Sequence, residues 1–201
     1  MKKETDWSEI CMGIFLTVMF VLMIICMCGC TPVPEDPNNT ITLTKAPKVE
    51  YFEQITISPL WLENIFRDKI SEKALLYRTT KFIINDRDYA QPTSKWVKNV
   101  YIPWYRDTMN AIGMMEYTNS SDCDKHATLF KIMAQICHKR TGTSKAQSLT
   151  IAEIHYITSG TSEHAINCIM CSDDVIFIEP QTGMEVYLSQ KQKDSIKDFI
   201  L

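Results

Sequence analysis

The sequence predicts an α+β fold, in which N-terminal helices pack on a C-terminal antiparallel β-sheet and one membrane segment precedes the domain. Three observations predict it. Residues 10–29 carry no charge. Apolar residues then recur at helical spacing, and after Gly142 the pattern changes to short β-rich runs that turn residues separate. Helices that come first and strands that follow are typical of the α+β order.

Composition sets the broad class of the protein. The chain has 201 residues, of which 45% are hydrophobic and 22% are charged. These values are ordinary for a globular protein and exclude a disordered chain, a collagen-like repeat and a polytopic membrane protein. Its 21 basic and 24 acidic residues leave no excess of positive charge to neutralise a phosphate backbone. We therefore expect no nucleic-acid partner.

The N-terminus predicts a membrane anchor. At about 1.5 Å per residue, residues 10–29 form a helix about 30 Å long, which is enough to span the hydrocarbon core. Lys2 and Lys3 favour a cytoplasmic N-terminus. The segment ends in MCGC, which resembles a bacterial lipoprotein signal with Cys30 as the acylated residue. An acylated lipoprotein and an uncleaved single-pass anchor both stay open, and both place the domain outside the cytoplasm at the cytoplasmic membrane.

The chain divides into three parts. Residues 1–30 form the signal or transmembrane anchor, residues 31–50 form a proline-rich tether, and residues 51–201 form one domain of common size. No internal repeat is visible.

The helices of the domain are predicted from caps and apolar spacing. Ser58 caps a helix that runs from Pro59 to about Tyr77. Residues 85–117 are rich in aromatic residues and predict irregular loops with one short helix near Asp107–Met115. The helix from Cys123 to about Lys139 carries an apolar stripe along its length.

Short β-rich runs follow and predict a meander of antiparallel strands. The runs are Leu149–Ile157, His164–Cys171, Val175–Gln181 and Glu185–Leu188. A charged, helical end is expected over Gln190–Lys197.

Cys123, His164 and Glu179 are the candidate catalytic residues. A cysteine in the first turn of a helix lies near free N–H groups and the positive end of the helix dipole, which favours the thiolate. A hairpin over Ser172-Asp173 puts His164 and Glu179 on one face of the sheet, where the acid can orient the imidazole. A register slip of two residues would place Gln181 opposite His164 instead.

The order of these residues resembles the transglutaminase-like branch of the papain-like cysteine proteinase superfamily. The matching pieces are DCDKHA at 122–127, EHAIN at 163–167 and IEPQ at 178–181. The resemblance implies Cys123 as nucleophile, His164 as general base and acid, Glu179 as the orienting acid, a helix packed on an antiparallel sheet, and no cofactor. An oxyanion donor is also needed, for which the Cys123 N–H, Trp96, Trp104 and Gln91 are candidates.

Two functions stay open. The first is a surface-anchored thiol hydrolase or acyltransferase that acts on amide bonds of peptides, proteins or cell-wall peptides. The alternative is a non-catalytic binding or adaptor domain on the same fold.

The C-x-x-C of Cys168 and Cys171 predicts no metal site. Residues three apart in a strand point to opposite faces. Core packing is the expected role of these residues, and a disulfide between Cys137 and another cysteine stays open.

Overall fold

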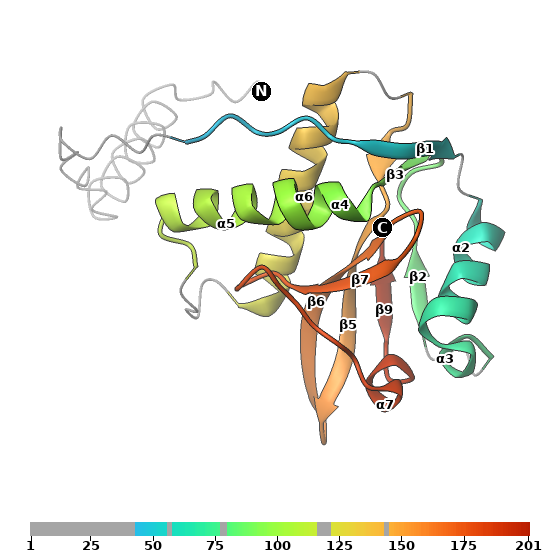
Figure 1. Cartoon of the computed structure of the whole chain (residues 1–201). Coiled ribbons are helices and arrows are strands. Elements are labelled where there is room, and N and C mark those ends of the chain that lie inside the picture. Colours follow the sequence, from blue (N-terminus) through green and yellow to red (C-terminus); the bar gives the residue numbers. More distant parts are fainter. Residues whose placement is uncertain (1–42, 56–57, 77–79, 116–121, 143–144) are drawn as a thin grey trace, which may run out of the picture. The chain divides into compact units, whose positions relative to one another are not determined.

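A computed structural model describes residues 43–55, 58–76, 80–115, 122–142 and 145–201 (Figure 1). No helix within these ranges is both long enough and apolar enough to cross a bilayer. The predicted anchor over residues 1–30, with Cys30, lies outside the described residues, as does most of the predicted tether.

Helices occur along the chain as two groups and two separate helices. The first group consists of α2 (Pro59–Ile65), the π-helical turn η1 (Phe66–Ile70) and α3 (Glu72–Leu76). The second consists of α4 (Ser94–Trp96), the π-helical turn η2 (Val97–Tyr101) and α5 (Ile102–Ala111). The last two are α6 (Cys123–Thr141) and the short α7 (Gln190–Lys193).

The strands form two sheets, one small and one large. The three-stranded sheet has the order β1-β3-β4, from β1 (Tyr51–Ile55), β3 (Tyr89–Pro92) and β4 (Ser148–Leu149). The six-stranded sheet has the order β2-β9-β5-β6-β7-β8, from β2 (Lys81–Ile83), β9 (Asp198–Ile200), β5 (Ile151–Ser159), β6 (Ser162–Met170), β7 (Val175–Glu179) and β8 (Met184–Glu185). Pairing is antiparallel except between β2 and β9 and between β3 and β4.

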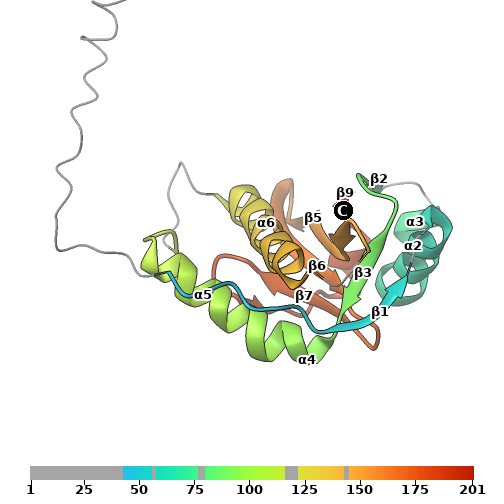
Figure 2. The same cartoon turned by 90° about the horizontal axis from the view of Figure 1, so that it is seen from above.

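Each face of the six-stranded sheet covers its own hydrophobic core, because successive side chains of a strand point to opposite faces. Ile169 and Ile176 pack with Phe130 of α6 and Tyr105 of α5 in the first core. Ile166 and its neighbours of the same parity pack with the α2 group and with β9 in the second core. Figure 2 shows α6 and the continuous helix of α4 and α5 on one side of the strands, and α2 and α3 on the opposite side.

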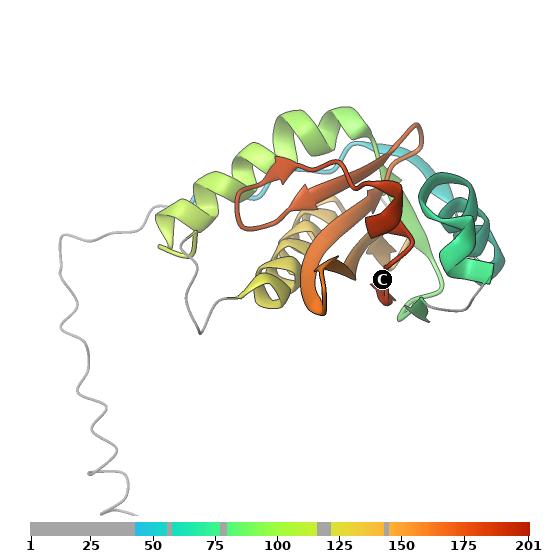
Figure 3. The ribbon, with the colours of Figure 1, turned by 90° about the horizontal axis from the view of Figure 1, so that it is seen from below.

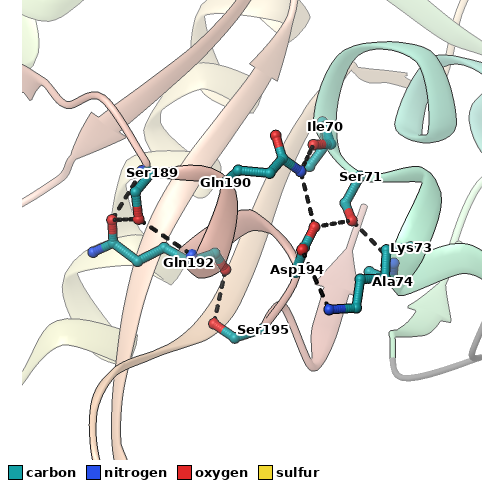
Figure 4. A network of polar contacts seen from close by, with 9 residues as sticks. All are labelled: Ile70, Ser71, Lys73, Ala74, Ser189, Gln190, Gln192, Asp194 and Ser195. Atoms are coloured by element: carbon teal, nitrogen blue, oxygen red, sulfur yellow. Dashed lines mark hydrogen bonds and ion pairs between the residues drawn. The ribbon is translucent and has the colours of Figure 1, made fainter.

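A polar clasp ties the C-terminal α7 to the α2 group (Figure 4). Asp194 accepts hydrogen bonds at 2.7 Å from the Ser71 hydroxyl and at 2.8 Å from the Gln190 amide. Lys73 lies 3.8 Å from the same carboxylate. The hydrogen bonds from Gln190 and Ser71 lower the pKa of Asp194, so its carboxylate is charged at neutral pH. The clasp therefore holds α7 against the α2 group.

The α+β class is confirmed, with a mixed and mostly antiparallel sheet, but several details of the prediction are wrong. Strands β1, β2 and β3 precede α6 and interrupt the expected run of helices, and the last of them pairs with β1 in the separate small sheet. A papain-like core is not supported. The predicted helix from Pro59 to about Tyr77 is broken at Ser71, whose backbone is extended with a φ of −156°.

The aromatic region was predicted as irregular loops with one short helix near Asp107–Met115. The loops are wrong, whereas the short helix overlaps the C-terminal half of α5. Residues 94–111 are helical throughout: the Thr93 side chain caps the start by accepting the Trp96 N–H, and the π-helical turn η2 leads directly into α5, whose first turn contains Pro103. Trp96 and Tyr101 stack on each other with ring centroids 5.2 Å apart inside the first core. The aromatic residues therefore make the buried face of a helix.

The predictions for the later elements are largely confirmed. Helix α6 begins at Cys123 and ends at Thr141, followed by Gly142 in the left-handed conformation. Strands β5, β6 and β7 match their predicted runs within about three residues. Strand β8 is shorter than predicted.

Candidate functional site

His164 and Glu179 form a close polar pair at one end of the β6–β7 hairpin. The imidazole Nε2 lies 2.6 Å from Oε2 of the carboxylate. The side chains are 28% and 20% exposed, so the pair is partly open to solvent at this end of the two strands. The other carboxylate oxygen of Glu179 accepts the backbone N–H of Gln181 at 3.4 Å. The structure therefore brings together two of the three predicted catalytic residues.

The register of the hairpin explains this contact. Cys168 pairs with Phe177 and Asn167 with Ile178, so continuing the ladder places Gln181 across from His164 and Glu179 diagonally from it. Long side chains reach diagonal positions. The predicted shared face is confirmed, and the register is the one that was predicted as a two-residue slip.

Two tyrosines lie around the pair. Tyr156 faces His164 from β5, with ring centroids 5.9 Å apart at an angle of 70°. Burial, and then the charge of Glu179, raise the pKa of Tyr156, and the same two causes raise the pKa of Tyr105 on α5. The Tyr105 hydroxyl is buried and has no hydrogen-bond partner among the described residues.

Cys123 is the half-buried first residue of α6. Its charge is a minor cause of the raised pKa of Tyr156, after burial and Glu179, so the thiol lies in the same neighbourhood. No hydrogen bond joins Cys123 to His164 among the contacts of the described residues. Helix α6 packs on the face that Asn167 shares, where the Asn167 amide donates to the Ala127 carbonyl at 2.9 Å. His164 has the parity of Ile166, whose side chain lies in the other core.

The predicted oxyanion donors have other contacts. Trp96 is 2% exposed, and its indole N–H donates to the Lys48 carbonyl at 2.7 Å. The indole N–H of Trp104 donates to the Thr44 carbonyl at 3.2 Å. Gln91 donates to the Cys171 carbonyl at 3.4 Å. Cys171 lies seven residues along the chain from His164, which corresponds to about 23 Å in an extended strand. The structure therefore places Gln91 far from the pair.

The four described cysteines form no disulfide. Cys123, Cys137, Cys168 and Cys171 are free thiols. No group of three or more potential metal ligands occurs in the described part of the chain. Burial raises the pKa of Cys137 and that of Cys171 to about 12, so both thiols are protonated at neutral pH.

A cavity of about 280 Å³ lies at the opposite end of β6 from His164, beside the turn that leads into β7. We call it the turn cavity. Its volume is close to the lower end of the range for ligand pockets, ~300–1,000 Å³. Its walls come from α2, η1, β3 and the turn, and the lining residues are Trp61, Ile65, Lys69, Gln91, Cys171, Ser172, Asp173, Asp174 and Val175.

Hydrogen bonds fix the shape of the turn that borders this cavity. The Cys171 N–H donates to the Asp174 carbonyl at 2.9 Å and closes the turn. The Ser94 hydroxyl donates to Asp173 at 2.7 Å, which lowers the pKa of this carboxyl group. Asp173 is therefore ionised at neutral pH and can accept further hydrogen bonds. Sequence analysis named the turn but missed this site, because Trp61 belongs to another element that only the fold brings here.

Comparisons with known proteins show no family. No family model matches the chain, and no curated protein matches it. Two similar solved structures are described as "PSL1a-E64 complex" and as Polyporus squamosus lectin bound to a "human-type influenza-binding epitope". Both have 18% sequence identity and a TM-score of 0.46, and they align with 64% and 65% of this chain. The chain spans about half of their length, 49% and 46%.

These comparisons correct the family predicted from the sequence. One of these two structures is described as a lectin, and neither is described as a transglutaminase or a papain-like proteinase. The predicted family is therefore wrong, together with the thiol hydrolase or acyltransferase activity that followed from it. The lipoprotein-like character of the chain gains no support either. Likeness at this level carries no ligand over to this chain, and the individual roles of Cys123, His164 and Glu179 stay predictions.

Proposed function

We propose that residues 51–201 form a non-catalytic binding domain whose ligand occupies the turn cavity. The observation that carries this proposal is the set of side chains in that cavity. An indole ring, a buried amide and two carboxylates converge there, and its one thiol, Cys171, is protonated at neutral pH. A cavity with a few convergent polar groups and no activated nucleophile is suited to binding.

The side chains define the kind of ligand. Trp61 offers an apolar aromatic surface, while Asp173 and Asp174 offer oxygens that only accept hydrogen bonds. A small molecule with an apolar face and several O–H donors at its rim matches both. Sugars have this chemistry, and the glycan Neu5Aca2-6Galb1-4GlcNAc, which is bound in the Polyporus squamosus lectin structure, belongs among the test ligands.

Calorimetric titration of the full chain tests the proposal. The probes are glucose, galactose, N-acetylglucosamine and the Neu5Ac-containing trisaccharide. We expect at least one probe to bind in the millimolar range or tighter. Trp61→Ala removes the ring and should weaken binding at least tenfold, whereas Leu60→Ala, on the same helix and 66% exposed, should leave binding unchanged. A folded Trp61→Ala variant with unaltered affinity would contradict the site.

A second variant separates a damaged fold from a damaged site. Asp174 is exposed, and its side chain accepts the Val175 N–H at 2.8 Å. Asp174→Asn keeps that acceptor but removes the charge, so the turn should stay intact while affinity for a hydroxyl-bearing ligand falls several-fold. Binding that survives both Trp61→Ala and Asp174→Asn would locate the ligand elsewhere.

We also propose that the predicted anchor presents this domain outside the cytoplasmic membrane. The support is the uncharged stretch of residues 10–29. Membrane fractionation of the full chain should recover it with the membranes, and mass spectrometry of the mature N-terminus separates the acylated form at Cys30 from an uncleaved anchor. Recovery in the soluble cytosolic fraction would contradict the anchor.

A further inference from the structure

A second cavity borders the turn cavity along the edge of the sheet. Its volume is about 200 Å³, and Asp174 and Val175 line both cavities. Its other walls come from β7, from β8 with the segment that follows it, and from α7, and they include Phe177, Glu185, Tyr187 and Lys193. We call it the edge cavity. Figure 3 shows β7, β8 and the following segment side by side.

The segment that follows β8, residues 186–188, is held beside β7 by backbone pairing. Glu185 pairs with Ile178, and the Val186 N–H donates to the Phe177 carbonyl at 2.9 Å. This pairing carries the chain back toward the turn, so Tyr187 comes level with the first residues of β7. The clasp at Asp194 fixes α7 on the other side, and Lys193 lies 5.7 Å from the centre of the Phe177 ring. The edge cavity is therefore built from ordered elements.

The two cavities repeat the same chemistry. Each has an aromatic residue, at least one carboxylate and one lysine in its lining: the partly buried Trp61 with Asp173 and Lys69 in the turn cavity, and Tyr187 with Glu185 and Lys193 in the edge cavity. Tyr187 is 88% exposed, which is unusual for a tyrosine side chain that packing alone would place. Repeated aromatic and acidic groups across a shared wall suit a ligand that repeats its own units.

We propose that the ligand is a neutral oligosaccharide, whose first unit lies in the turn cavity and whose next unit lies in the edge cavity against Tyr187. The proposal rests on the proposed function and names its ligand class. Each sugar ring sets an apolar face against an aromatic side chain, and its hydroxyl groups donate to the carboxylates between and beside the cavities.

The charges at the wall that the two cavities share favour a neutral ligand over an anionic one. The linings carry three carboxylates, Asp173, Asp174 and Glu185, and one lysine in each cavity, and of these charged residues only Asp174 lines both cavities. Glu185 is paired with Lys98 at 3.0 Å, which leaves Asp173 and Asp174 as the acceptors nearest to the shared wall. An added carboxylate or phosphate on the ligand would approach these two charges and be repelled.

A length series tests the second cavity. The probes are N-acetylglucosamine and glucose with their β-1,4-linked dimers and trimers, titrated into the full chain. We expect affinity to rise at least tenfold from the monomer to the dimer and little from the dimer to the trimer. Tyr187→Ala should abolish this rise while the affinity for the monomer is unchanged. Tyr187→Phe keeps the ring and should retain most of the rise.

The outcomes distinguish this inference from the proposed function. A flat length series, with binding that Trp61→Ala still abolishes, overturns the edge cavity and leaves the turn cavity standing. An equal loss of monomer and dimer affinity in Tyr187→Ala also overturns it, because Tyr187 would then not serve a second unit. Tighter binding of the Neu5Ac-containing trisaccharide than of every neutral probe overturns the neutral ligand. No binding by any sugar overturns both proposals.

Discussion

The two ends of strand β6 differ in how their polar groups are satisfied. At the His164 end, the imidazole and Glu179 satisfy each other at 2.6 Å, and tyrosines surround them. At the Cys171 end, an indole ring and two carboxylates border a cavity of about 280 Å³. A catalytic triad requires its groups to be linked, whereas a binding site requires groups that remain available to a ligand. The comparison therefore supports the proposal that the ligand binds at the Cys171 end.

The middle of β6 packs in the core between its two ends. Truncating a buried side chain there should have the largest effect on the stability of the fold. Ile166 is fully buried in the second core. Ile166→Ala should lower the free energy of unfolding by about 2–5 kcal/mol, because it leaves a cavity that the core fills only in part. Phe177→Ala, opposite Cys168, should cost a similar amount. Urea unfolding measures both.

The matched control for these two variants is on the surface. Ile132 on α6 is 51% exposed, and Ile132→Ala should change the stability by about 0.5 kcal/mol or less. An equal effect of Ile132→Ala and Ile166→Ala would show that the assignment of the two cores is wrong.

The His164 end also depends on the turn after β7. Gly183 has a φ of +65°, and a Cβ at this position would lie 2.6 Å from Cγ of Arg106. Gly183→Ala should therefore cost about 1–3 kcal/mol, from backbone strain and the clash together. Gly160 has a φ of +58° with nothing within 4 Å, so Gly160→Ala carries the strain alone. Thermal unfolding of the two variants should rank Gly183→Ala as the less stable, and the reverse ranking would contradict the packing around Arg106.

The stability that a second histidine–glutamate pair contributes should depend on pH, and it can be compared with the His164–Glu179 pair. His155 lies 2.8 Å from Glu153 beneath α6, and the hydrogen bond to Glu153 raises the pKa of His155 above its usual 6.5. The raised pKa means that the folded state holds the proton more tightly. This contribution is complete below pH 6.5 and is lost as the pH rises through the raised value.

The measurement compares the wild type with His155→Gln between pH 5 and pH 9. The stability difference should be largest at low pH and should shrink toward high pH, by about 1 kcal/mol or less for a partly exposed pair. A difference that grows with pH would contradict the assigned direction.

The sequence predicted what depends on local pattern. Helix α6 and the hairpin of β6 and β7 follow from caps, periodicity and turn residues, and the His164–Glu179 contact follows from strand alternation. The helix over residues 94–111 was missed, because its aromatic residues are spaced for burial among elements that are distant in the sequence.

The turn cavity could not be predicted, because its walls are nonlocal. Trp61 and Asp173 are more than one hundred residues apart in the chain and meet only through the packing of α2 against the turn. Tyr187 is an exposed aromatic residue in this part of the surface. The sequence shows that the residue is aromatic, but its exposure becomes known only from the fold.

The most direct test of the central claim, binding without thiol chemistry, is the rate at which iodoacetamide labels each cysteine at neutral pH, followed by mass spectrometry. Cys123 is more accessible than the buried Cys137, Cys168 and Cys171, so wild type is compared with His164→Ala rather than with those residues. The account predicts that Cys123 reacts at the same rate in both proteins, because no hydrogen bond joins it to His164. A rate for Cys123 that falls tenfold or more in His164→Ala would contradict the account and show that the imidazole activates the thiol.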